Sequence, residues 1–440
     1  MTSLPSRPSP DAAPAWLRGL WPILLVAAVT LASRLPFLGE GYGTDPDAWR
    51  VVGAARHIAE TGEYAYSRAP GYPLQELTYA LAWRLTPPAA RPVVFNGLTA
   101  LLSAAAAGAL TAILLALRHD AMGAVLGGLA LAATPVVYLN SVNAMDYVWA
   151  LALFLGALCA LLRGRPLGAG VLLGLAVTCR ITSGALLAPL GVLAWGGGPR
   201  GDRWGRLAQL VGGTLAVAGI GYLPVVLRYG PGFFTFYEKG YPSLPAVWQR
   251  GVPDVWGVVG TVALALAALL GVAEAFLLRR APRRPGRQMV AWGLGALLVV
   301  GAYLRLPHEA GYLAPLVPLV LLLAHGALRR AVFAGLCVAL IISPFADVPA
   351  PWVGEGGRGA SILQDARARA AGQRYTEWVL AAGDGLAPPA VVVAGPELPR
   401  VQADPRCGAR EDLQYVYSLD AAEYADYVSR GYRVYYVPGL

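Results

Sequence analysis

Two carboxylates stand one residue apart early in the chain, in the segment GTDPDAWR at positions 43–50. Asp45 and Asp47 can serve as a general base, as ligands of a divalent cation, or as both, because each offers carboxylate oxygens. Aspartate is also frequent in turns, where its side chain bonds to nearby backbone. The pair by itself is therefore compatible with chemistry and with a purely structural turn.

A second polar segment reads SRAPGYPLQE at positions 67–76, and three of its residues are candidates for binding a substrate: Arg68, Tyr72 and Glu76. The structural alternative is a turn fixed by its prolines. In that alternative Arg68 forms a salt bridge within the loop, with Glu63 or Glu76.

Five further residues that could take part in binding or catalysis lie at the ends of apolar runs: Asp146, Arg180, His308, Glu309 and Tyr312. The charged ones each have a structural alternative. Asp146 can cap the helix that follows it, and Arg180 can extend toward the membrane surface as long basic side chains do. His308 and Glu309 can cap a helix start.

For the remaining basic residues, the sequence context favours structural roles. Lys239 is the only lysine of the chain, and it stands in the aromatic segment FYEKGY, which is typical of a membrane-interface belt. His57 and His119 are predicted to be surface residues.

Composition identifies the elements that must position these side chains. The chain of 440 residues is 56% hydrophobic and only 14% charged, whereas about a quarter of the residues of soluble proteins are charged. The net charge of +9 comes from arginines in short clusters between apolar runs, as the positive-inside rule expects of a membrane protein. Nucleic-acid binding is therefore not predicted, and the four cysteines have neither metal-binding nor disulfide spacing.

The apolar runs predict about eleven transmembrane helices, since a span needs about 20 mainly apolar residues. Nine runs begin near Leu20, Val93, Ala121, Tyr147, Leu207, Val255, Met289, Tyr312 and Ala331. The stretch 167–195 is too long for one helix and is broken at Arg180, so it predicts a hairpin of two short helices. We interpret the first run as a retained signal anchor, because it lacks a small-residue cleavage site.

Arginine clusters at the breaks predict a cytoplasmic N-terminus and an extracytoplasmic C-terminus. The outer segments are then 38–92, 140–146, 228–254, 305–311 and everything after 345. Within the first outer loop, positions 48–58 have the apolar spacing of a helix lying in the membrane interface. The candidate residues named above therefore gather on one face of a multi-pass protein of the plasma membrane.

The tail from 346 to 440 is more polar than the rest of the chain. Helical stretches at 361–382 and 421–430 and strand-like runs at 391–395 and 432–437 predict a small extracytoplasmic α/β domain. The predicted fold class is thus an all-α polytopic membrane domain, residues 1–345, with this appendage.

Several motifs in this order and sidedness resemble polyprenyl-phosphate-sugar-dependent glycosyltransferases of the GT-C fold, such as dolichyl-phosphate-mannose-protein mannosyltransferases. The loop with its acidic pair and the RAPGYP turn are followed by NAMDY at 143–147, GLAVTCR at 174–180 and HEAGYLAP at 308–315. The last motif departs from the family pattern, because Glu309 follows His308 directly and Gly311 stands where relatives often have arginine. The resemblance covers roughly residues 15–345.

This resemblance implies transfer of a sugar from a polyprenyl-phosphate donor to an acceptor hydroxyl of a glycan, lipid or protein, by an inverting single displacement at the outer face. A carboxylate would take the hydroxyl proton, and the family pattern favours Asp45 over Asp47 for that role. Arg68, Arg180 and His308 are the candidates for the donor phosphate. The acidic pair fits a divalent cation site as well as a metal-free base with a helper.

The alternative is a non-enzymatic transporter or lipid flippase. A transporter is expected to have two related halves and charged residues near mid-span. Neither feature is found in the sequence, where the long outer loop occurs once and the spans are nearly free of charge.

Overall fold

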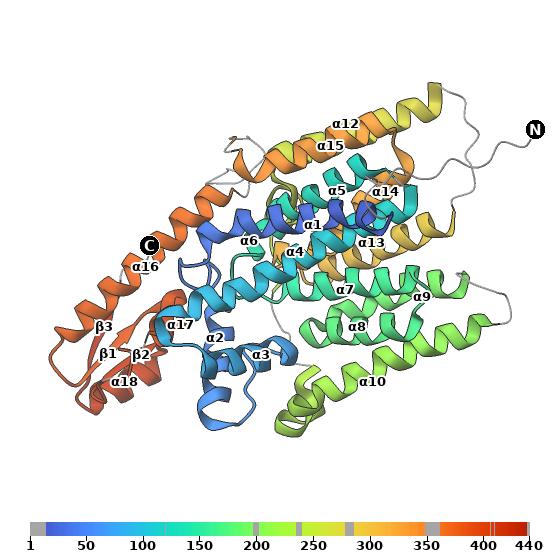
Figure 1. The fold of residues 1–440 in the computed structure, drawn as a ribbon. Helices are drawn as coiled ribbons and strands as arrows, with labels where there is room; N and C mark the ends of the chain where they lie inside the picture. The colour runs from blue at the N-terminus through green and yellow to red at the C-terminus, as the bar shows by residue number, and fades with distance from the viewer. Residues whose placement is uncertain are drawn as a thin grey trace, which may run out of the picture.

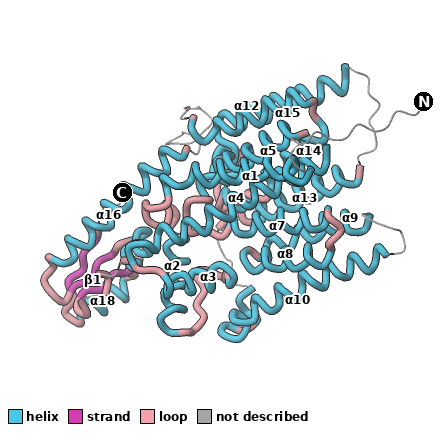
Figure 2. Tube along the Cα trace, viewed as in Figure 1, coloured by secondary structure: helices cyan, strands magenta, loops and turns pink. Residues whose placement is uncertain are grey.

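A computed structural model describes residues 15–118, 120–196, 202–234, 240–277, 286–346, 348, 361–404, 406–408 and 410–437. These residues form an elongated bundle of apolar helices with a small α/β domain at one end (Figures 1 and 2). His119, Lys239 and most of the basic break at 279–287 lie outside the described residues.

The apolar helices of the described part of the chain match the predicted spans in number and order. Six are long enough to cross a membrane: α1 (Ala15–Arg34), α4 (Arg91–Arg118), α10 (Arg203–Tyr229), α12 (Pro253–Leu277), α13 (Arg287–Arg305), and the short 3₁₀ helix η6 (Ala310–Leu313) continued by α14 (Leu316–Ala327). Five are shorter: α5 (Ala121–Ala133), α7 (Tyr147–Leu162), α8 (Pro166–Cys179), η3 with α9 (Ile181–Leu186, Leu187–Gly196), and α15 with η7 (Arg330–Ile342, Ser343–Phe345). The first apolar run, interpreted as an anchor, is α1, which packs against α4 and α5 within the bundle.

Small residues allow α8 and α10 to approach closely. A Cβ added at Gly170 would lie 2.4 Å from the Leu210 carbonyl oxygen, and one at Gly174 would lie 2.8 Å from the Thr214 carbonyl oxygen. Glycines four residues apart on one helix face are a common device for helix packing in membranes. This contact fixes the position of α8. Arg180 lies between the last residue of α8 and the first residue of η3, which confirms the predicted break between two short helices.

The long loop between α1 and α4, predicted to be the first outer loop, contains two further helices, α2 (Pro46–Thr61) and α3 (Pro73–Leu85). α2 buries one face and exposes the other, in agreement with the predicted amphipathic helix. Leu77, Leu81 and Leu85 follow one another at four-residue spacing on α3 and are exposed, which suits contact with the acyl region of a membrane.

The C-terminal domain contains the helices α16 (Ile362–Asp384), α17 (Leu398–Ala403) and α18 (Ala421–Ser429) and the strands β1 (Ala390–Val393), β2 (Leu413–Val416) and β3 (Arg433–Tyr436). The sheet is parallel with strand order β2-β1-β3. The α/β character was predicted, but β2 was missed, because a four-residue edge strand with one buried and three half-buried residues leaves little periodicity to detect.

The C-terminal domain meets the helix bundle at the end that contains the first long loop. α17 packs against α2, and α16 packs against the short helix α6 (Pro135–Asn140). Another short helix, α11 (Leu244–Gly251), contacts η6. Figure 1 places α2, α3 and α6 at this same end.

Candidate active site

Asp45 and Asp47 lie at the start of α2. Asp45 is the N-cap residue, and its side chain accepts a hydrogen bond of 2.8 Å from the backbone N–H of Asp47. Carboxylates are favoured at this position because the helix N-terminus carries partial positive charge. The turn role considered for Asp45 is therefore real, and the cap bond engages only one of its two carboxylate oxygens.

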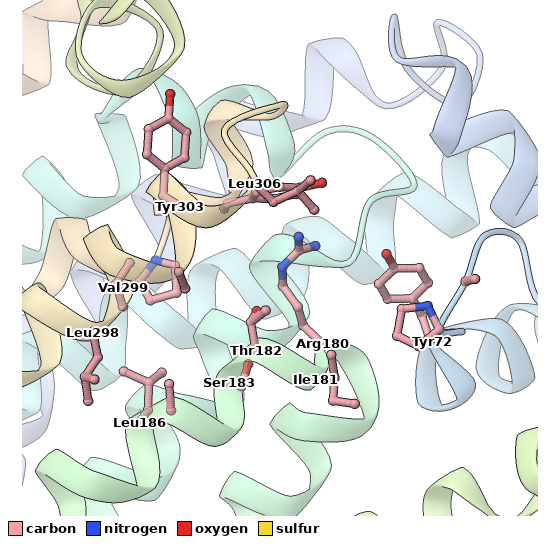
Figure 3. Close-up of a pocket in the computed structure, with 16 residues that line it drawn as sticks. Tyr72, Arg180, Ile181, Thr182, Ser183, Leu186, Leu298, Val299, Tyr303 and Leu306 are labelled. Atoms are coloured by element: carbon pink, nitrogen blue, oxygen red, sulfur yellow. The ribbon is translucent and has the colours of Figure 1, made fainter. Parts of the chain in front are cut away.

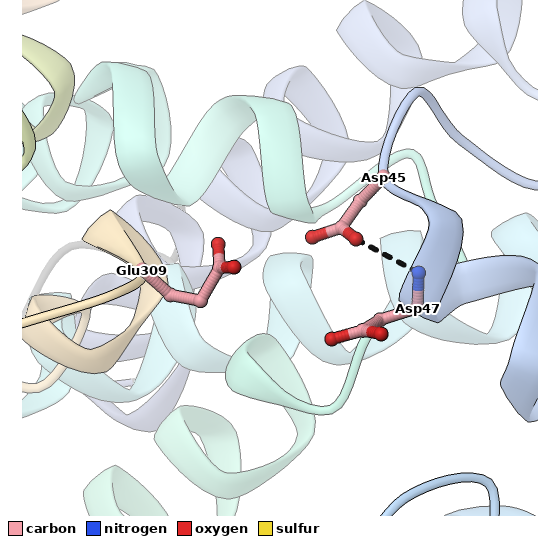
Figure 4. Close-up of side chains that lie close together, drawn as sticks. All are labelled: Asp45, Asp47 and Glu309. Carbon is pink, nitrogen blue, oxygen red and sulfur yellow. Dashed lines mark hydrogen bonds between the residues drawn. The ribbon is translucent and has the colours of Figure 1, made fainter. Parts of the chain in front are cut away.

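Glu309 faces this acidic pair from the loop that precedes η6. Oxygen atoms of Asp45, Asp47 and Glu309 all lie within 4.8 Å of one another, and all three residues are half-buried (Figure 4). The sequence suggested Glu309 as a substrate-binding residue on the same face as the first loop, but it did not identify Glu309 as a neighbour of the acidic pair. His308 is the neighbouring residue on the same loop.

The three carboxylates have different proton affinities. Burial and the repulsion of Asp47 raise the pKa of Asp45 above its ordinary value of 3.8. Burial also acts to raise the pKa of Asp47, but the charges of Arg68 and Arg50 outweigh it and lower this pKa. Burial, together with repulsion from Asp45 and Asp47, raises the pKa of Glu309 to about 7. Asp47 is thus the fixed anion, and the other two carboxylates are suited to exchanging protons.

Arg68 links this acidic group to the N-terminus of α7. Its guanidinium bonds to the Asp47 carboxylate and, at 2.6 Å, to a carboxylate oxygen of Asp146. The structure contains neither of the salt bridges considered for Arg68 within the loop, because Glu63 pairs with Arg228 and Glu76 bonds to other groups. Arg68 is therefore a bridge between two candidate residues that lie far apart in the chain.

Asp146 is fully buried and binds two arginines. One carboxylate oxygen accepts from Arg68, and the other accepts a hydrogen bond of 2.5 Å from Arg180. Asp146 stands at the N-cap position of α7 but makes no capping hydrogen bond with its side chain. Asp146 therefore holds the predicted N-cap position, but its carboxylate binds the two arginines instead of capping the helix.

We expect Asp146→Asn to lower the free energy of unfolding by about 3 kcal/mol, because removing one partner leaves buried charges uncompensated. Thermal unfolding of the purified protein in detergent would measure this loss. Asp426→Asn is the matched control, since Asp426 pairs with Arg430 on an exposed surface, where an ion pair contributes little. Equal stability of the two variants would contradict a stabilising role for the buried pairs.

Arg180 is held between two aromatic rings rather than extended toward the membrane surface. Its guanidinium carbon lies 4.4 Å from the ring centroids of both Tyr147 and Tyr312, and only 8% of the residue is exposed. The surface-reaching alternative is wrong because Asp146 and the two rings draw the guanidinium inward. Tyr147 was not among the predicted site residues, although its position directly after Asp146 was a usable signal.

Three buried donors around Asp146 have no hydrogen-bond partner among the described residues. They are Arg68 Nε, Arg180 Nε and the hydroxyl of Tyr147. Buried polar groups are normally satisfied, so a set of unpartnered donors at one place indicates a ligand that accepts hydrogen bonds. Two of the three are guanidinium groups, which match phosphate and carboxylate oxygens in geometry and charge.

An apolar cavity of about 250 Å³ opens beside Arg180, between the α8–α9 hairpin and α13 (Figure 3). Its walls are mainly aliphatic, and its polar lining comes chiefly from Arg180, Thr182, Ser183 and three tyrosines. Tyr72 and Tyr312, both candidates from the sequence, belong to this lining. The cavity therefore combines an apolar interior with a cationic group.

Glu76 occupies a different position from the other candidates. Its carboxylate accepts hydrogen bonds from the Tyr64 hydroxyl, from the backbone N–H and hydroxyl of Ser67, and from the backbone N–H of Tyr72. These bonds fix the turn that carries Arg68, and Arg68 in turn lies over the Tyr72 ring at 4.7 Å. The structure thus gives Glu76 a place in shaping the loop.

Three further basic residues were predicted to have structural roles: His57, His119 and Lys239. His57 is exposed on α2, as predicted for a surface residue. Lys239 and His119 lie outside the described residues.

Comparison with solved structures identifies the fold. The chain is similar to the crystal structure of ArnT from Cupriavidus metallidurans in the apo state, with a TM-score of 0.57 at 16% sequence identity, over 96% of this chain and 90% of that one. It is equally similar to ArnT from the same organism bound to undecaprenyl phosphate, over 97% of this chain and 90% of that one. No protein-family model matches the chain, and no curated protein matches it by sequence. The likeness establishes the GT-C fold that the sequence motifs had indicated.

Proposed function

We propose that this chain of GT-C fold is a membrane glycosyltransferase. It moves a sugar from a polyprenyl-phosphate-linked donor to an acceptor hydroxyl of a glycan, lipid or protein, at the outer face of the plasma membrane. The observation that carries the proposal is the set of unpartnered donors on Arg68, Arg180 and Tyr147, placed between the apolar cavity and the carboxylates.

Each part of this site matches one part of the donor. The apolar cavity suits a segment of the lipid chain, and Arg180, which lines that cavity, suits the phosphate. One of the two crystal structures of similar fold contains undecaprenyl phosphate, a ligand that combines a polyprenyl chain with a phosphate. That ligand supports a lipid phosphate as the partner of this chain as well.

The proposed transfer is an inverting single displacement. The acceptor hydroxyl oxygen attacks the anomeric carbon while the bond from that carbon to the phosphate oxygen breaks, and the bonding pair leaves with the lipid phosphate. Asp45 takes the hydroxyl proton, and its raised pKa suits a general base. Arg68 and Arg180 stabilise the negative charge that develops on the phosphate.

The test of the function is incubation of membranes containing the protein with radiolabelled polyprenyl-phosphate sugars and candidate acceptors. We expect label to move from the lipid to an acceptor, with release of the lipid phosphate. A flippase would instead change the leaflet of the labelled lipid without breaking the sugar–phosphate bond. Movement between leaflets with no transfer in the same vesicles would therefore reject the enzyme and support the alternative.

The carboxylates of Asp45, Asp47 and Glu309 also fit a divalent cation that prefers oxygen ligands, because they come from two separate segments and converge within 4.8 Å. A bound cation would supply positive charge near the donor phosphate. If it is required, we expect a chelator to reduce transfer at least tenfold and Mn²⁺ or Mg²⁺ to restore it. Calorimetric titration of Mn²⁺ into wild-type protein and Glu309→Gln gives a readout independent of activity, and equal binding by the two would exclude Glu309 as a ligand.

We further propose that the N-terminus is cytoplasmic and that the C-terminal domain, including position 400, is extracytoplasmic, while positions 279–287 are cytoplasmic. Arg400 is only 6% exposed, so a cysteine at the exposed Ser429 is a better reporter of the outer side. Arg165, exposed in the break between α7 and α8, reports the inner side.

An impermeant thiol reagent on intact cells should label Ser429→Cys and leave Arg165→Cys unlabelled until the cells are opened. Both variants need a Cys407→Ser background, because Cys407 lies in the C-terminal domain and is partly exposed. Labelling of Arg165→Cys in intact cells would reverse the proposed topology.

A further inference from the structure

Two loop segments carry the residues that we place at the reaction, and they run side by side. The backbone N–H of Ala144 donates to the Tyr42 carbonyl at 2.8 Å. Gly43 has φ of +141°, and a Cβ there would lie 2.8 Å from the Cβ of Asn143. Segment 41–45, which ends at Asp45, is thus packed closely on segment 142–146, which ends at Asp146.

The C-terminal domain binds the first segment at Thr44, the residue directly before Asp45. Arg400 of α17 donates a hydrogen bond of 2.7 Å to the carbonyl of Thr44, and the Thr44 hydroxyl donates to Asp365 of α16 at 2.8 Å. Arg400 is also paired with Glu397 at 2.9 Å. The residue next to the proposed base is therefore held by two helices from the other end of the chain.

The same domain binds the second segment. Arg369 of α16 donates a hydrogen bond of 2.7 Å to the Val142 carbonyl and another of 2.7 Å to Asp365. Arg369 is 2% exposed. Asp365 therefore connects the contact on Thr44 with the contact on Val142, and one rigid helix spans both segments.

We propose that Arg369 and Arg400 are positioning residues, through which the C-terminal domain clamps segments 41–45 and 142–146 and sets Asp45 relative to Asp146. The inference rests on the proposed function, in which these two aspartates serve sugar transfer. A carbonyl can accept from water as readily as from arginine, so the buried arginines contribute position rather than chemistry. Small displacements of reacting groups cost rate steeply, which gives such a clamp a large effect.

The first test is independent of transfer activity. Hydrogen exchange of the full-length protein in detergent should become roughly tenfold faster in peptides covering 41–48 and 142–150 in Arg369→Ala and Arg400→Ala. Gly372→Ala is a second route to the same effect, because a Cβ there would lie 1.9 Å from Arg400 Nη1 and displace the guanidinium. The controls are Arg406→Ala, which removes an exposed ion pair of the same domain, and Gly385→Ala, where a Cβ meets only ordinary contact at 3.5 Å.

The second test measures transfer. We expect kcat to fall roughly ten- to a hundredfold in Arg369→Ala and Arg400→Ala, with donor affinity unchanged, and Arg400→Lys to recover part of the rate. Because Arg369→Ala leaves the largely buried Asp365 without its partner, this variant also loses stability, so rates are compared at a temperature at which every variant is folded. Unchanged exchange in both segments would overturn the clamp. Faster exchange with wild-type kcat would overturn the positioning role. If the wild-type protein transfers no sugar, the proposed function fails, while the exchange data still decide whether the clamp exists.

Discussion

Asp45→Asn should lower the rate of sugar transfer by roughly 10² to 10⁴, the usual contribution of a general base, while leaving expression and donor binding intact. Asparagine caps helices as well as aspartate does, so the hydrogen bond to the Asp47 N–H that begins α2 can be kept. What is lost is the proton acceptor. Initial rates at saturating donor, together with a separate measurement of donor binding, separate these two effects.

The pH profile gives a second readout of the same variant. Burial and Asp47 raise the pKa of Asp45 above 3.8. The wild-type kcat/KM should therefore rise with pH along an acidic limb, and the midpoint of that limb should lie above this value. The base is protonated and inactive below the limb and ionised above it. Asp45→Asn should flatten this limb, since no ionisation of residue 45 remains.

Asp120→Asn is the matched control for Asp45→Asn. Asp120 also caps a helix, α5, by accepting from the Gly123 N–H at 3.3 Å, but it belongs to another end of the bundle. We expect this variant to keep full activity. Wild-type turnover in Asp45→Asn would transfer the base role to Glu309, whose pKa of about 7 and position opposite Asp45 make it the next acceptor.

Arg180→Ala should weaken donor binding by roughly 10²-fold, because hydrogen bonds from a charged group to an anion each contribute about 1.5–3 kcal/mol. Arg180→Lys should recover only part of this, since an ammonium group lacks the planar fork and cannot reproduce the unpartnered Nε donor. Donor affinity and thermal unfolding, measured on all three proteins, separate binding from stability.

The fold should tolerate the loss of Arg180, because Asp146 keeps its ion pair with Arg68. Arg165→Ala is the control, as Arg165 precedes α8 while Arg180 follows it, and Arg165 is exposed. Normal donor affinity in a stable Arg180→Ala protein would reject Arg180 as a phosphate ligand. If Arg180→Ala loses stability and the alanine and lysine variants are equally active, Arg180 has a structural role instead.

The helices of the membrane bundle were largely determined by the sequence alone. The length and apolar character of a span are properties of about 20 consecutive residues, so the spans and the hairpin broken at Arg180 could be predicted. The position of Asp45 and Asp47 after the first span follows from the same reasoning. The short strand β2 could not be found in this way, because its only regular feature is its pairing with β1.

The connections within the site were decided only by the tertiary structure. Asp146 had a local explanation as a helix cap, and Arg68 had local glutamates, yet the two bind each other across 78 positions of sequence. Glu309 meets Asp45 from a late loop, and Arg400 reaches Thr44 across 356 positions. The sequence thus determined which polar residues lie at the ends of the helices, because burial in lipid is a local requirement. Which of them form ion pairs depends on how distant helices pack, and a charge at a helix end has several candidate partners until that packing selects one.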